Sequence, residues 1–114
     1  MIKPDDPRQL AIDLLDRSTC HVQVAAVIAD QHGIFSWGWN HSGRDGYGEH
    51  AEAAAIRRAN PWRLDHSTIY IAGRRKGQVF SRPCADCQKL LKGYGVWFTV
   101  YTLSKDGWQE ETLD

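Results

Sequence analysis

The fold is decided by residues 67–102, which read STIYIAGRRKGQVFSRPCADCQKLLKGYGVWFTVYT. An apolar, β-branched run at 67–72 and a second apolar run at 96–102 predict two strands. Between them, Pro83 stands where helices begin, and we expect a helix over 84–92. Strand–helix–strand units form parallel strands with a right-handed crossover, so this stretch predicts an α/β domain with a helix-covered sheet.

The chain before this stretch predicts two further helices and a β-hairpin. The expected elements are a helix over 5–17 capped by Asp5 or Asp6, strands over 21–29 and 34–39, and an alanine-rich helix from His50 to about Asn60. The hairpin turn has the composition Asp-Gln-His-Gly, which is typical of tight turns. The segment 40–48 is a loop whose three glycines let the backbone approach a ligand closely.

The end of the chain predicts an antiparallel edge strand. Only five residues, 103–107, separate the strand at 96–102 from a possible strand at 108–113. A parallel crossover needs about a dozen residues, so a last strand must run antiparallel. We expect residues 73–77 to form a basic loop and Trp37 to pack in the core. The sequence thus predicts a single domain, residues 1–114, with a mixed sheet of four to five strands flanked by helices.

Composition places the chain among ordinary globular proteins. It has 114 residues, of which 42% are hydrophobic and 25% charged, and Lys plus Arg balance Asp plus Glu at 14 each. A net charge of zero argues against tight non-specific binding to a polyanion. Three cysteines, two of them in one C-x-x-C, argue against a disulfide framework and indicate a reducing, cytoplasmic location. No apolar run is long enough to span a bilayer, so we expect no membrane partner.

Two short motifs supply the side chains of a catalytic zinc site. His50 offers an imidazole, Cys84 and Cys87 offer two thiols, and Glu52 offers a carboxylate. Three protein ligands leave the fourth position of zinc to water, as catalytic sites require, whereas a structural site closes its shell with a fourth Cys or His. A helix N-terminus favours thiolate over thiol, and this suits Cys84 and Cys87 at the first turn of their helix.

These motifs resemble those of the zinc-dependent cytidine and deoxycytidylate deaminase superfamily. The resemblance lies in His50-Ala51-Glu52 followed by Pro83-Cys84-x-x-Cys87, and the order of helices and strands agrees over roughly residues 22–102. It implies a three-layer cytidine-deaminase-like fold, a bound Zn²⁺, and hydrolytic conversion of cytosine to uracil. Glu52 would then be the general acid and base rather than a ligand.

The resemblance also implies where a substrate binds. In that family an Asn at the position of Asn40 commonly contacts the sugar, although the residue could equally have been selected for its turn geometry. The backbone around Ala51 and Cys84, with Pro83, would hold the edge of the base. Tyr47 could stack on the base, and so could Trp39, for which core packing is an equal alternative. Relatives commonly share active sites between subunits, so the resemblance leaves both a monomer and a homo-oligomer open.

Alternative readings of the same residues stay open. The leading hypothesis is an enzyme of nucleotide metabolism that acts on a free cytidine-type nucleoside or nucleotide. A second is a deaminase acting on cytosine in single-stranded DNA, with the basic residues of segment 74–92 contacting phosphate. A third is a catalytically silent zinc-binding module of the same fold. A structural zinc site would need a fourth ligand, for which Cys20 is a candidate, although a lone Cys before a buried strand usually packs in the core.

Overall fold

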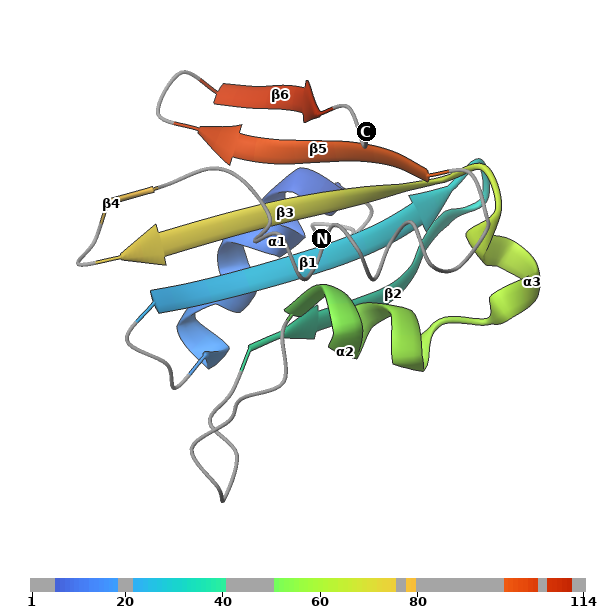
Figure 1. The fold of residues 1–114 in the computed structure, drawn as a ribbon, viewed down its shortest axis with the longest axis horizontal. Coiled ribbons are helices and arrows are strands. Elements are labelled where there is room, and N and C mark those ends of the chain that lie inside the picture. The colour runs from blue at the N-terminus through green and yellow to red at the C-terminus, as the bar shows by residue number, and fades with distance from the viewer. Residues whose placement is uncertain are drawn as a thin grey trace, which may run out of the picture.

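The computed structural model describes residues 6–18, 22–40, 51–75, 78–79, 98–104 and 107–111. Within these residues the molecule has three layers, and a twisted sheet separates helix α1 (Pro7–Leu14) from helix α2 (Ala51–Arg58) (Figure 1). This arrangement confirms the predicted three-layer α/β fold. None of the helices described is long and apolar enough to cross a membrane.

The sheet is mixed, as the sequence predicted. Its strands are β1 (Val22–Asp30), β2 (Gly33–Trp39), β3 (Ser67–Arg75), β4 (Gln78–Val79), β5 (Phe98–Ser104) and β6 (Gly107–Glu111). They lie in the order β2-β1-β3-β5-β6, and the short β4 pairs with the end of β3. Strands β3 and β5 run parallel, which confirms the strand–crossover–strand unit, and every other pairing is antiparallel.

Strand β1 is buried on both faces and links the two halves of the core. Ala26 and Ile28 pack in the apolar cluster that includes α2, whereas Ala25 and Val27 pack in the cluster that includes α1. All four side chains are fully buried. Successive side chains of a strand point to opposite faces, so one short apolar run supplies both layers of the core.

Helix α1 begins where the sequence places a cap. The Asp6 carboxylate accepts hydrogen bonds from the backbone N–H groups of Arg8 and Gln9, at 3.0 and 3.4 Å, and Pro7 occupies the first helical position. The helix buries Ala11 and Leu14 and continues into a single 3₁₀ turn, η1 (Leu15–Arg17). It thereby covers the face of the sheet opposite α2.

Helix α2 lies unusually close to strand β2 because the contact is made by small residues. A Cβ atom placed on Gly38 would lie 2.7 Å from the Ala54 Cβ, 2.7 Å from the Ala55 backbone N and 2.9 Å from the Ala51 backbone O. Ser36, two residues earlier on the same face, donates its hydroxyl hydrogen bond to the Ala55 backbone O. Only glycine at position 38 permits the helix to approach the strand this closely.

The antiparallel last strand is also confirmed, because β6 pairs with β5 from Ser104↔Gly107 to Val100↔Glu111. The first helix, the hairpin and the alanine-rich helix appear within a few residues of their expected bounds. The expected helix over 84–92 lies outside the described residues, as do residues 96 and 97 of the expected last parallel strand.

Two expectations are wrong. Gly73, Arg74 and Arg75 are not loop residues, because β3 continues through them and pairs with the start of β1, whose backbone offers partners there. Trp37 is not a core residue, because it lies on edge strand β2 and is 45% exposed. Asn60-Pro61 ends α2 as expected but also starts helix α3 (Pro61–Leu64), where the Asn60 side chain accepts from the Trp62 N–H.

The close contact predicts that Gly38→Ala destabilises the protein. The new methyl group meets backbone atoms of α2 that cannot move without shifting the helix, so we expect a loss of about 1–3 kcal/mol in the free energy of unfolding. Urea unfolding measures it. Ala54→Gly removes one of the three contacted atoms, so the double variant should lose less than the two single variants together. Strict additivity would contradict a direct contact between position 38 and α2.

Candidate functional site

Two of the sequence-predicted site residues, Asn40 and Ala51, lie at the same end of the sheet. Helix α2 starts at Ala51, whose backbone O lies beside Gly38 near the end of β2, and it runs back along β2 towards Ser36. Asn40 follows β2 directly and continues its pairing with β1, because its backbone N–H donates to the Val24 carbonyl at 3.0 Å. The structure therefore brings Asn40 and the first turn of α2 to the same end.

Ala51 is fully buried, and Glu52 is the second residue of α2. The remaining predicted site residues lie outside the described ranges: His50, Tyr47, Pro83, Cys84 and Cys87. Their place in the chain is still informative. His50 immediately precedes α2, and both cysteines fall in the connection between parallel strands β3 and β5. Among the described residues there is no group of three or more potential metal ligands.

The Asn40 side chain is held by three hydrogen bonds. Its Oδ1 accepts from the Val24 backbone N–H at 2.9 Å and from the Ser18 hydroxyl at 2.6 Å. Its Nδ2 donates to the Val22 backbone carbonyl at 2.8 Å. The amide thus pairs with strand β1 much as another residue of β2 would. Sequence reasoning singled out Asn40 but gave no sign of Ser18, which is 6% exposed.

A chain of polar contacts continues from Ser18 across this end of the sheet. Gln23 donates to the Ser18 carbonyl, and the Arg74 guanidinium donates to the Gln23 side chain at 2.8 Å and to Asp16 at 2.6 Å. The last contact is an ion pair between β3 and η1. Arg74 therefore fastens strand β3 to the α1 layer, a structural role that the basic composition of segment 74–92 did not reveal.

Trp39 packs as a partly buried member of the core cluster on the α1 face. Two guanidinium groups lie over its ring, that of Arg58 at 5.3 Å and that of Arg17 at 5.6 Å from the ring centroid. Arg58 also donates to the Trp37 backbone carbonyl at 3.4 Å. These contacts support the packing interpretation of Trp39 over stacking on a substrate base.

The sequence model of the cytidine and deoxycytidylate deaminase zinc-binding region matches residues 5–103, which is most of the chain. The chain belongs to this deaminase family. A comparison with curated proteins finds no match.

Solved deaminase structures share the fold. Cytidine deaminase from Burkholderia pseudomallei superposes with a TM-score of 0.72 at 15% identity, covering 98% of this chain and 94% of that one. Cytidine deaminase from Mycobacterium leprae gives 0.66 at 18% identity, with 96% and 94% covered. The dCMP deaminase of cyanophage S-TIM5 gives 0.64 at 21% identity, with 93% and 89% covered.

The donor set of this deaminase chain suits zinc. One imidazole and two thiols are borderline and soft ligands that bind zinc in three-ligand catalytic sites. The residues present therefore fit the metal that the family's description names.

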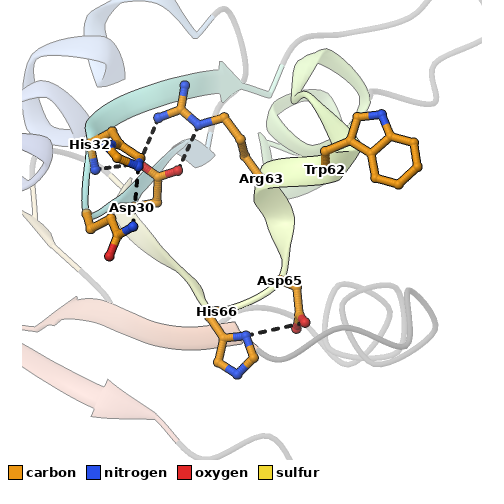
Figure 2. Close-up of a pocket in the computed structure, with 7 residues that line it drawn as sticks. Asp30, His32, Trp62, Arg63, Asp65 and His66 are labelled. Carbon is orange, nitrogen blue, oxygen red and sulfur yellow. Dashed lines mark hydrogen bonds and ion pairs between the residues drawn. The ribbon is translucent and has the colours of Figure 1, made fainter.

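A separate pocket of about 340 Å³ lies at the opposite end of the hairpin (Figure 2). The Asp30 carboxylate and the Arg63 guanidinium form two hydrogen bonds there, each 2.7 Å long, which join the β1–β2 turn to α3. Arg63 also lies 4.3 Å from the centroid of the Phe35 ring. Trp62 points away from this ion pair and is 92% exposed.

This pocket lies far from the end of the sheet that holds Asn40. Strand β1 runs from Val22, beside Asn40, to Asp30 in the pocket. Its nine residues separate the two ends by about 27 Å. The hydrogen bonds from Arg63 lower the pKa of Asp30 to about 2, against the opposing effect of burial. The ion pair thus fixes the hairpin turn against the segment that follows α2.

The lowered pKa predicts a pH-dependent contribution to stability. Because the folded-state pKa lies below the unfolded value of 3.8, the stabilisation is complete above about pH 4 and is lost as the pH falls towards 2. Wild type should therefore exceed Asp30→Asn in free energy of unfolding at pH 5–7, and the difference should shrink below pH 4. Urea unfolding across this range measures the difference, with Arg63→Lys as the variant that keeps the charge but not the two-pronged geometry. A difference independent of pH would show that the ion pair does not hold the turn.

Proposed function

We propose that this protein is a zinc-dependent hydrolytic deaminase that converts cytosine to uracil in a free nucleoside or nucleotide. The main support is the match of the deaminase family model to residues 5–103. This range contains the motif residues at their characteristic spacing, namely His50, Glu52, Cys84 and Cys87. The fold supports the proposal independently. The described helices and strands superpose on those of cytidine and dCMP deaminases along nearly their full length.

In this proposal His50, Cys84 and Cys87 hold the metal. Bound zinc would act as a Lewis acid and lower the pKa of water, so that a nucleophile is available near neutral pH. Glu52 would take the proton released by that water and deliver protons to N3 of the ring and to the departing ammonia. The balance is one water consumed, one ammonia released and one carbonyl gained at C4.

Helix α2 is suited to carry this chemistry because its position is fixed. Ala51 is fully buried against β2, so the backbone of the first turn cannot shift without disturbing the core. Proton transfer depends on placing the carboxylate within hydrogen-bond reach of the reacting atoms, and a rigid helix start meets this demand.

For the substrate, we propose a free nucleoside or nucleotide rather than single-stranded DNA. Asn40 would contact the sugar, and Ala51, Tyr47 and Pro83 would surround the base. The cyanophage dCMP deaminase, which shares the fold at a TM-score of 0.62 and 22% identity, was crystallised with dCMP and dUMP. Arg74, a candidate phosphate contact for a bound strand, is already paired with Asp16 and Gln23. A homo-oligomer with sites at its interfaces stays a prediction.

The test is deamination by zinc-loaded protein across one substrate panel. We expect ammonia release and uracil formation from cytidine, deoxycytidine or deoxycytidylate, and none from a cytosine-containing single-stranded oligonucleotide. Glu52→Gln should lower kcat by about 10²–10⁴-fold because it removes the proton carrier. Its zinc content and melting temperature should match wild type. Glu110→Gln, a neutralised carboxylate on the exposed edge strand β6, is the matched control.

Two outcomes would contradict the proposal. Turnover of the oligonucleotide alone would identify a single-stranded DNA deaminase instead. Equal behaviour of wild type and Glu52→Gln on every substrate, with zinc bound in both, would identify a silent zinc-binding module. Each outcome leaves the fold untouched and changes only the assigned chemistry.

A further inference from the structure

The Asn40 side chain ends the β1–β2 ladder by imitating the peptide group of a longer strand. Its backbone N–H still pairs with the Val24 carbonyl. The next two groups of β1, the Val24 N–H and the Val22 carbonyl, are paired by the Asn40 amide instead of by backbone. The β1 edge is thus satisfied, and the chain can leave the sheet after residue 40 towards the start of α2.

These contacts fix which way the amide faces. A backbone N–H can only donate and a carbonyl can only accept, so Oδ1 must face Val24 and Nδ2 must face Val22. The Ser18 hydroxyl then occupies the second acceptor position of Oδ1 at 2.6 Å. The oxygen has no acceptor capacity left. The nitrogen carries two hydrogens and uses one of them, and no partner for the other is found among the described residues.

We propose that Ser18 is a positioning residue that makes Asn40 a pure hydrogen-bond donor towards the substrate. This inference rests on the proposed function, in which Asn40 contacts the sugar, and it specifies the chemistry of that contact. The substrate must offer a lone pair, as a sugar hydroxyl oxygen does. Without the Ser18 hydroxyl, Oδ1 of Asn40 would have a free lone pair, and the Asn40 amide would keep two of its three hydrogen bonds.

The location of Asn40 agrees with such a role. Asn40 lies two residues beyond Gly38, about 7 Å further along the strand direction, and Gly38 touches the first residue of α2. A sugar bound at Asn40 would therefore lie close to the start of the helix that carries Glu52. Ser18 comes from the opposite layer, where it follows η1, and so ties the α1 layer to this end of the sheet.

The test compares nucleoside and free base as ligands. Ser18→Ala should raise the KM for cytidine and the inhibition constant of uridine by about fivefold, as the loss of one hydrogen bond implies. The inhibition constant of uracil should stay at the wild-type value, and kcat should change much less than KM. Ser18→Thr, which keeps the hydroxyl, should restore the wild-type KM.

Ser67→Ala is the matched structural control. Ser67 is also buried and donates its hydroxyl hydrogen bond to the Leu64 carbonyl, but it lies at the far end of β3 from Arg74. Its loss should lower the melting temperature without changing the ratio of the uridine and uracil constants. Equal increases of both constants in Ser18→Ala, or no increase in either, would overturn the proposal.

A second readout separates this inference from the proposed activity. In wild type labelled with nitrogen-15, uridine should shift one of the two Asn40 side-chain N–H proton resonances and leave the other, which is bonded to Val22, nearly unchanged. Such a shift without any turnover would mean that the activity assignment fails while the donor role holds. Turnover of cytidine with no shift at Asn40 would overturn the donor role alone.

Discussion

The structure depends on the close approach of helix α2 to strand β2. Gly38 provides the space, and the alanines of α2 provide a surface without long side chains. The Ser36 hydroxyl bond to the Ala55 carbonyl adds a directional contact beside it. Backbone atoms and small side chains make this contact, so the helix cannot slide or rotate on the strand as it could if long, flexible side chains made it. Its first turn, with Ala51 and Glu52, is therefore held at a defined place beside the sheet.

The sheet supplies both the rigidity and the placement of the proposed site. Strand β1 is an inner strand, and the side chains along its apolar run face the two helix layers alternately. One end of β1 meets Asn40, Ser18 and the contacts that lead to Arg74. The other end is fixed by the Asp30–Arg63 ion pair. The first end is where we place the proposed site, and the second joins the hairpin to the segment after α2.

The sequence predicted the architecture because its main signals are local. The apolar run of β1, the turn at Asp30, and the Asp6 cap each act within a few residues, so pattern and propensity identify them. The short connection expected between the strand at 96–102 and the one at 108–113 was enough to predict an antiparallel β6. His50, Cys84, Cys87 and Glu52 were singled out from motif spacing and from the family resemblance, and their roles stay predictions.

What sequence reasoning missed depends on partners distant in the chain. Gly73 to Arg75 looked like a loop because of their composition, but the start of β1 supplies a pairing partner. Trp37 looked like a core residue, yet its strand lies at an edge of the sheet. Ser18 was not noticed, since its contact with Asn40 spans 22 positions. Such contacts are set by tertiary geometry, which no local pattern records.

The central claim is an open zinc site held by one imidazole and two thiolates beside α2. Zinc K-edge X-ray absorption of the purified, zinc-loaded protein tests it most directly. The account predicts two sulfur neighbours at about 2.3 Å and two nitrogen or oxygen neighbours at about 2.0–2.1 Å, one from His50 and one from an exchangeable ligand. A third sulfur neighbour would indicate that Cys20 closes the shell, and the site would then be structural rather than catalytic.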